Sequence, residues 1–314
     1  MTTLTAGIRV IRDVLVEYID IDYSLWLTWM LTPLLLSFLL PFVIILLFCT
    51  TAMILYVYKH REKLRGLSEL DFWNRARKTV ALLWDAHGWV WYGYEIEGLE
   101  NLPDGGALIV YYHGTLPVDL YYFIARVYLM KNRLVQTVAD RFLFNVPGWN
   151  IISEGIKVIP GTVNTCCQIV ESGHLLAVSP GGVYEALFGD QSYPIMWKSR
   201  VGFAKVALQA KVPIIPMFTE NVREAFRTMA PMKSLWLKLY NWTRLPIMPI
   251  YGGFPVKLVT HLGSPLLPSP NSTPQQLQKE CAEAISALIE KHQRLPGCMM
   301  LAVADRLYRK PKLD

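Results

Sequence analysis

His113 and Asp119 lie on either side of a turn between an apolar segment and a helical pattern, and both side chains can move protons. Residues 107–112 are apolar and predict a buried strand, and Pro117 precedes a helical pattern over residues 118–130. An imidazole at such a turn, with a carboxylate within reach, has the composition of a general base and its orienting partner. The alternative is a turn histidine that bonds only to the backbone, the commoner situation for an isolated pair.

Two adjacent glycines, Gly181 and Gly182, follow a second apolar segment at residues 174–179. Paired glycines let a ligand approach the backbone and can aim N–H groups at a developing oxyanion; the alternative is an ordinary tight turn. Ligands of a parallel sheet bind beyond the carboxyl ends of its strands, where His113 and the glycine pair both fall. Together the two features predict a site at this edge. Glu185 either bonds the substrate or the glycine turn, or is purely structural.

Short apolar runs alternate with helical patterns from about residue 66 onward. The runs predict strands at residues 107–112, 135–139, 156–159, 174–179, 213–218 and 256–262. Helices are expected at residues 118–130, 163–172 and 200–210, and a last helix begins at Thr273 and Pro274, where Gln276 can complete a capping box. This alternation predicts an α/β sandwich with a mostly parallel central sheet.

The N-terminal segment is long and apolar enough to meet a membrane. No charged side chain occurs in the 36 positions from 23 to 58, more than the roughly 20 residues that cross a bilayer. One tilted helix over residues 32–56, with Pro33 in its first turn and a kink at Pro41, is the simplest prediction. A helical hairpin bent near Pro41 is the alternative. We therefore divide the chain into a membrane anchor, residues 1–65, and a domain, residues 66–314.

Charge predicts how the chain is oriented and what it meets. Residues 59–65 carry four cations and one anion, whereas residues 1–22 carry two arginines and four acids, so the domain is expected to face the cytosol. The five cysteines show no metal-type spacing, and we expect reduced thiols and no metal site. The net charge of +6 is scattered among Trp and Tyr, which favours anionic lipid headgroups over nucleic acid as the partner.

Four sequence blocks occur in order behind this anchor: residues 113–119, 155–161, 179–185 and 212–216. They resemble the four blocks of the glycerolipid O-acyltransferase superfamily and are most similar to its diacylglycerol acyltransferase branch. The resemblance implies an acyltransferase-like α/β sandwich in the endoplasmic reticulum membrane that takes acyl-CoA as co-substrate and needs no cofactor. It implies His113 as the base, Asp119 as its orienting partner, and an oxyanion or substrate-binding region at Gly114, Gly181, Gly182 and Glu185.

The first block departs from the family spacing, because five residues and not four separate His113 from Asp119. This departure is the best support for an alternative of another class, a membrane-anchored lipid-binding or scaffold protein that has lost its activity. The retained His113 and glycine turn argue against that alternative. The sequence contains no GxSxG serine elbow, so a covalent acyl-enzyme is not expected.

Two arginines that the phospholipid-making branch uses to bind the acceptor's phosphate are missing. Their positions hold Gly161 and Tyr184, so the forked donor for a phosphate is lost. This favours a neutral acceptor, either a mono- or diacylglycerol that leads to triacylglycerol or a long-chain alcohol. A lysophospholipid acyltransferase is the alternative within the enzyme class. The sequence leaves the oligomeric state open.

Overall fold

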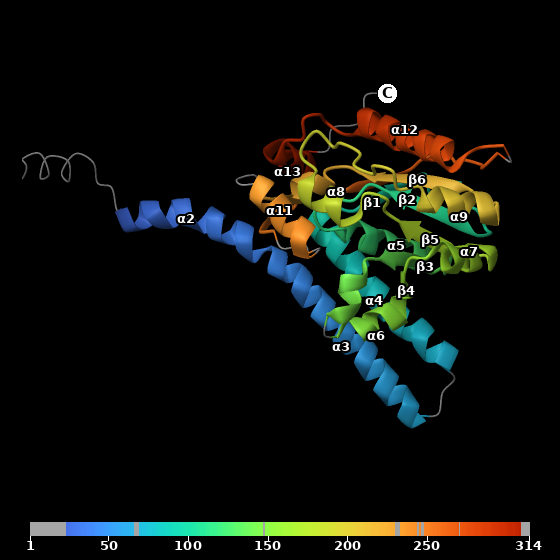
Figure 1. Cartoon of the computed structure of the whole chain (residues 1–314). Helices are drawn as coiled ribbons and strands as arrows, with labels where there is room; N and C mark the ends of the chain where they lie inside the picture. Colours follow the sequence, from blue (N-terminus) through green and yellow to red (C-terminus); the bar gives the residue numbers. More distant parts are fainter. Residues whose placement is uncertain are drawn as a thin grey trace, which may run out of the picture.

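The computed structural model describes residues 23–65, 69–146, 148–229, 233–243, 245, 248–269 and 271–308. The acid-containing segment 1–22, on which the orientation prediction partly rests, lies outside these ranges. A seven-stranded sheet at the centre has the order β1-β9-β6-β2-β5-β3-β4 (Figure 1). Its strands are β1 Glu95–Glu97, β2 Ala107–Tyr111, β3 Val135–Ala139, β4 Val158–Pro160, β5 Leu175–Val178, β6 Ile214–Thr219 and β9 Val259–Leu262, and a two-stranded sheet pairs β7 Phe226–Thr228 with β8 Ile250–Gly252.

Helices surround the sheet. The helices are α2 Tyr23–Leu39, α3 Pro41–Arg65, α4 Glu69–Tyr92, α5 Val118–Lys131, α6 Trp149–Ile156, α7 Val163–Glu171, α8 Gly182–Phe188, α9 Gly202–Ala210, α10 Val222–Ala225, α11 Lys233–Thr243, α12 Pro274–His292 and α13 Met299–Leu307, with two 3-10 turns at Leu99–Asn101 and Arg141–Asn145. The predicted start of α12 is confirmed, because Thr273 and Gln276 form the expected capping box.

The central sheet is mostly parallel, as predicted. β2 pairs in parallel with β5 and β6, β3 with β4 and β5, and β1 with β9, while β6 and β9 are antiparallel. The carboxyl ends of β2, β5 and β6 therefore meet at one edge, where the residues that follow them are brought together.

Each face of the sheet is covered by its own helices, which gives three layers. Side chains of β2 alternate between the two apolar cores: Ile109 and Tyr111 pack in one, with α3, α4, α5 and α6, and Leu108 and Val110 in the other, with α7, α9 and α12. Figure 1 shows α12 on one side of the sheet and α4 on the opposite side. A strand that is apolar on both faces is what a buried parallel sheet requires.

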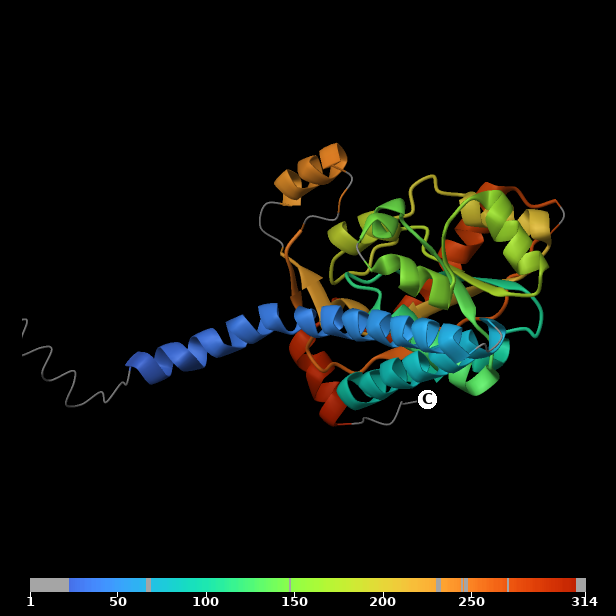
Figure 2. The ribbon, with the colours of Figure 1, turned by 90° about the horizontal axis from the view of Figure 1, so that it is seen from below.

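The apolar N-terminal segment forms one long, slightly broken rod. α2 and α3 follow each other end to end, and the rod bends between them, where the helix is interrupted at Leu40 (Figures 1 and 2). Residues Leu27–Arg61 form one helix long and apolar enough to cross a membrane by length and composition. The hairpin alternative is not formed. Pro33, which was expected in the first turn of a helix, lies inside α2. Pro41, where a kink was expected, is the first residue of α3 after the break, a position that suits a residue with no N–H to donate.

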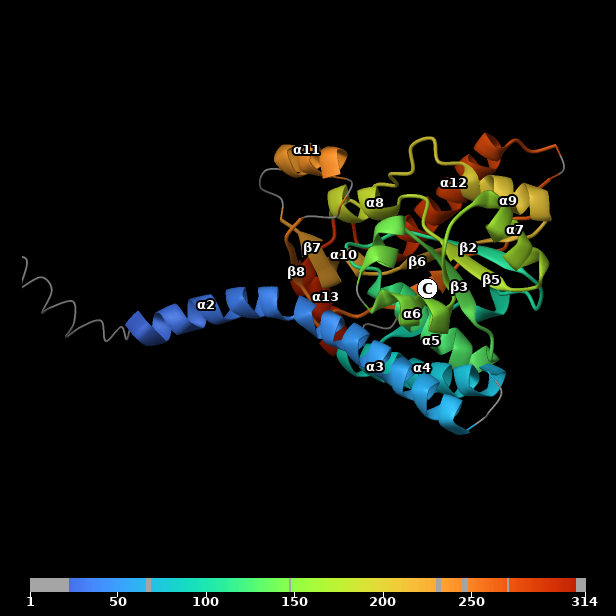
Figure 3. The same ribbon diagram turned by 60° about the horizontal axis from the view of Figure 1, so that its bottom comes forward.

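α3 also packs against the α/β domain. It lies beside α4, as Figure 3 shows, and contacts α6. Ile44, Leu47 and Leu55 of α3 are buried in the core, whereas Leu46 and Met53 are largely exposed. One stripe of this helix therefore belongs to the domain and another is free to face an apolar medium.

Candidate active site

His113 follows β2, and its ring is fixed by its own turn. The ring Nδ1 lies 2.6 Å from the carbonyl oxygen of Gly114, which can only accept, so Nδ1 carries the hydrogen and the lone pair is on Nε2. The ring also stacks on Tyr111, with 5.9 Å between centroids. Burial, reinforced by the Arg223 cation, lowers the pKa of His113 to about 4, although the bond to Gly114 raises it. His113 is therefore a neutral base near pH 7.

Glu185 supports the backbone of this turn. Its side chain is fully buried, with Oε2 accepting from the N–H of His113 at 3.0 Å and Oε1 accepting from the N–H of Met196 at 2.9 Å. Burial raises the pKa of this carboxyl, and the two backbone bonds lower it. Of the roles considered from the sequence, the geometry favours the structural one.

The glycine pair forms the turn between β5 and α8. Gly182 has φ +48°, a left-handed conformation that favours glycine, and its N–H donates weakly to the Ser179 hydroxyl at 3.4 Å. A guanidinium nitrogen of Arg200 donates to the carbonyl oxygens of Pro180 and Gly181 at 2.8 and 2.9 Å. Arg200 thus braces the carbonyl side of the turn.

Asp119 is buried in the first turn of α5 and does not reach the imidazole. Neither of its carboxylate oxygens has a hydrogen-bond partner of normal geometry in the described part of the chain. Burial raises the pKa of Asp119 to about 7, although the Thr219 hydroxyl and nearby backbone N–H groups lower it. The carbonyl of Gly114 takes the orienting place at Nδ1 that was expected for Asp119. A catalytic role for Asp119 stays a prediction.

A cavity of about 610 Å³ opens beside His113. Gly182 and Arg200 lie in its wall with the histidine, and so does Arg141, in the 3-10 turn that follows β3. Gly114, Asp119, Gly181 and Glu185 are not among its described lining residues. The remaining wall is largely apolar. Ile44 and Phe48 come from the N-terminal rod and Tyr240 from α11. The other apolar residues of the wall include Leu120, Tyr121, Phe142, Leu143, Trp149, Leu187 and Ile250.

The geometry is that of a base beside an apolar cavity, and comparison with known proteins shows the family. Residues 93–220 match the family model described as Acyltransferase. The chain is 45% identical over 319 residues to a Bos taurus protein named "DGAT1/2-independent enzyme synthesizing storage lipids", covering 100% of this chain and 95% of that protein. A Homo sapiens protein of the same name is 46% identical, covering 92% of this chain and 89% of that protein. The chain belongs to the acyltransferase family.

The four sequence blocks resemble the glycerolipid acyltransferases and, within that superfamily, transmembrane protein 68. These relatives confirm that resemblance. Among solved structures, the crystal structure of the 1-acyl-sn-glycerophosphate (LPA) acyltransferase PlsC from Thermotoga maritima is 18% identical, with a TM-score of 0.49. The match covers 79% of this chain and 96% of that one.

Some residues that line the candidate cavity were not placed beside His113 from the sequence. Arg200 and Tyr240 line the cavity, although each lies far from His113 along the chain. Ile44 and Phe48 were assigned to the anchor alone, yet they form part of the cavity wall. No local spacing signals such contacts, because they depend on how α3 and α11 pack against the domain.

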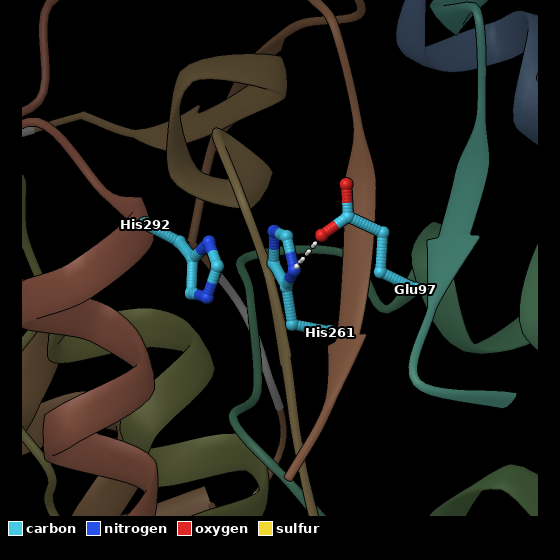
Figure 4. A group of neighbouring side chains, drawn as sticks. All are labelled: Glu97, His261 and His292. Atoms are coloured by element: carbon cyan, nitrogen blue, oxygen red, sulfur yellow. Dashed lines mark ion pairs between the residues drawn. The ribbon is translucent and has the colours of Figure 1, made fainter. Parts of the chain in front are cut away.

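A second cluster of polar groups lies where β1, β9 and α12 meet (Figure 4). His261 lies 3.1 Å from Glu97 through Nδ1 and 2.5 Å from Glu220 through Nε2, and its ring stacks on His292 at 3.6 Å with 19° between planes. Glu97, His261 and His292 each offer an atom that can bind a metal, and these atoms lie within 4.8 Å of one another, but both ring nitrogens of His261 already face the carboxylates of Glu97 and Glu220. Lone pairs in nearly parallel planes do not converge, so we interpret the cluster as a contact that ties α12 to the sheet.

The Asp119→Asn substitution separates a catalytic from a structural role. We expect it to lower kcat less than His113→Ala does, because it leaves the base in place. Because the folded carboxyl titrates near pH 7 and an unfolded one near 3.9, the folded protein holds a proton that the unfolded chain releases, and wild-type stability falls as pH rises between these values. The Asn variant has no carboxyl to titrate, so its stability does not fall in this way as pH rises.

Thermal unfolding therefore gives a second measurement. As pH rises from 5 to 8, the free energy of unfolding of Asp119→Asn is expected to increase by on the order of 2 kcal/mol relative to that of wild type. A kcat loss equal to that of His113→Ala would instead show that the two residues act as one catalytic unit.

Proposed function

We propose that the protein is an acyl-CoA-dependent O-acyltransferase of the endoplasmic reticulum membrane that makes neutral glycerolipid by acylating a mono- or diacylglycerol. The observation that carries the proposal is the neutral His113 imidazole, with its Nδ1 already bonded, in the wall of a largely apolar cavity. A free alcohol is a poor nucleophile near pH 7, and a positioned base contributes about 10² to 10⁴-fold to its attack.

The reaction is an acyl transfer in two steps. His113 Nε2 takes the proton as the acceptor oxygen attacks the thioester carbonyl, which forms a C–O bond and moves an electron pair onto the carbonyl oxygen. N–H groups of the Gly181–Gly182 turn stabilise this oxyanion, an effect worth about 3 kcal/mol per donor. Collapse of the intermediate breaks the C–S bond, and the imidazolium returns its proton to the departing thiolate of CoA.

The acceptor is proposed to enter from the bilayer along α3 and α11. Phe48 of α3 and Tyr240 of α11 line the cavity, and Tyr240 also contacts the aromatic ring of Phe188 at 5.8 Å. On the outer side of α11, Leu235 and Trp242 are exposed, which suits a helix at the membrane interface. The long acyl chains of the acceptor would then pass from the apolar interior of the bilayer directly into the largely apolar cavity.

A lysophospholipid acyltransferase remains the second candidate, and one observation favours it. Arg141 and Arg200 line the cavity, although neither belongs to the blocks that bind phosphate in the phospholipid branch. Arg200 is already bonded to two carbonyl oxygens of the glycine turn, so we assign it to bracing that turn. The neutral acceptor therefore remains our proposal.

Purified protein incubated with labelled oleoyl-CoA and a panel of acceptors tests the proposal directly. We expect label in acylglycerol that depends on His113. Absence of transfer to every acceptor, from protein that binds lipid and is folded, would favour the inactive scaffold instead.

Orientation in the membrane has its own test. Asn241 lies in an Asn-Trp-Thr sequence at the exposed end of α11, and Asn271 begins a second acceptor sequence. If the domain faces the cytosol, neither meets the lumenal glycosylation machinery, so glycosidase treatment should leave the electrophoretic mobility unchanged. A mobility shift that Asn241→Gln removes would overturn the proposed orientation and, with it, cytosolic access to acyl-CoA.

A further inference from the structure

The main-chain groups of His113 belong to a closed ring of hydrogen bonds. Its N–H donates to Glu185 Oε2 at 3.0 Å, and its carbonyl oxygen accepts from Arg223 Nη2 at 3.1 Å. The same Nη2 donates to the main-chain oxygen of Glu185 at 2.6 Å. Both main-chain polar groups of the residue that carries the imidazole are thus held by two buried, charged side chains from other elements.

Arg223 makes further contacts with the same end of β2. Its Nε donates to the Tyr112 hydroxyl at 2.5 Å, and its guanidinium carbon lies 5.1 Å from the centre of that ring. Arg223 is only 2% exposed and lies on α10, which follows β6. A buried charge is costly unless its hydrogen bonds are satisfied, so this guanidinium and its three acceptors form one rigid arrangement.

We propose that Arg223 is a positioning residue of the acyl transfer, because its guanidinium joins the end of β2 to α8 and so fixes the His113 ring relative to the glycine turn. The inference rests on the proposed role of His113 as the base. Glu185, which spans the same two elements, completes the frame. No contact between Arg223 and the substrate is implied.

The chemistry of the contacts explains why the residue is an arginine. A planar fork reaches the Tyr112 hydroxyl through Nε and two carbonyl oxygens through Nη2, whereas a lysine ammonium is a single point charge on a flexible stem. Positional precision of this kind matters, because a misplacement of about 1 Å costs on the order of 10²-fold in rate.

The Arg223 charge also acts on the base. Arg223 from α10 and Glu185 from α8 bond the main chain of His113, and Asp119 lies at the start of α5. The cavity wall that holds His113 also carries Asp140, Arg141 and Arg200. Arg223 lowers the pKa of His113, so removal of its charge raises that pKa. Protonation of the base then begins at higher pH, and the acid limb of the kcat/KM profile moves in the same direction.

Two substitutions in the full-length protein separate position from charge. Arg223→Lys keeps the charge and loses the fork: kcat should fall on the order of 10²-fold, with KM for oleoyl-CoA within about threefold and the acid limb unmoved. Arg223→Gln loses both, so kcat should fall at least as far and the acid limb should move to higher pH. Arg227→Lys is the control for the same neighbourhood: Arg227 contacts Glu224, Gly297 and, at 3.4 Å, the main-chain oxygen of Arg223, but it makes no bond to the Arg223 guanidinium or to His113 in the described chain.

The outcomes are distinguishable from failure of the proposed function. If His113→Ala abolishes transfer but Arg223→Lys keeps kcat within about threefold of wild type, the inference is overturned and the function stands. Equal losses of kcat and Tm in Arg223→Lys and Arg227→Lys would also overturn it, because general stability would explain both. Should the Arg223 variants not fold, Tyr112→Phe decides: a lower kcat at unchanged KM supports the inference, and an unchanged kcat refutes it.

Discussion

Replacement of His113 by alanine is expected to lower kcat for acyl transfer by about 10² to 10⁴-fold, the range that a positioned base contributes. The loss should appear in kcat and kcat/KM together, because the imidazole acts in the transition state and does not bind the acyl chain. The side chain is half-buried at the end of β2 and supports no core, so expression and thermal stability should stay near wild type. Initial rates with labelled oleoyl-CoA measure the effect.

A matched control is His174→Ala. His174 directly precedes β5 and so lies at the amino ends of the parallel strands, on the edge of the sheet opposite to His113. The same chemical change there should leave kcat unaltered. Activity of His113→Ala within a few-fold of wild type would remove the base from the mechanism.

Acylation of a neutral acylglycerol should be at least about tenfold more efficient than acylation of lysophosphatidate, because phosphate finds no forked donor at positions 161 and 184. Each missing charge-assisted hydrogen bond costs on the order of 1.5 to 3 kcal/mol, and two of them correspond to about two to four orders of magnitude at 1.4 kcal/mol per tenfold. Tyr184 instead holds the Lys198 ammonium over its ring at 3.8 Å.

Monoacylglycerol and lysophosphatidate of the same acyl chain form a matched pair, since they differ only in the phosphate. The ratio of their kcat/KM values in identical liposomes measures the acceptor preference, because the acyl chain and the lipid environment are the same for both acceptors. A reversed preference would mean that other cations bind the phosphate. If Arg141→Gln then lowered only the lysophosphatidate rate, the neutral acceptor would have to be given up in favour of the lysophospholipid candidate.

The sequence predicted those elements whose pattern is local. β3 and α5 occur almost at their expected bounds, because runs of apolar residues and a proline mark them. The strands β1, β7 and β8 were missed, since each has only three residues and a charged residue or a glycine interrupts it. α4 was missed too: it carries Trp84 buried and Trp89 largely exposed, which obscures the contrast between its two faces.

Prediction of the site followed the same division. His113 and Gly182 were identified from spacing, and the structure places both on one cavity. Arg223 carries no such signal, because its bond to His113 joins residues 110 positions apart. The carbonyl of Gly114 at Nδ1 could not be predicted either, because an argument about side-chain types does not consider main-chain groups, and the role of Asp119 stays a prediction.

The N-terminal rod is more than a tether. Ile44 and Phe48 of α3 form part of the cavity wall, and Leu55 is buried in the core of the domain. An unrelated membrane helix grafted in this place would hold the domain at a bilayer but leave the cavity without that wall. If this helix anchors the domain and the cavity takes the substrate, as proposed, adaptation of the helix to a thicker or thinner bilayer also alters the surface that the substrate meets, and anchoring and substrate range cannot evolve independently.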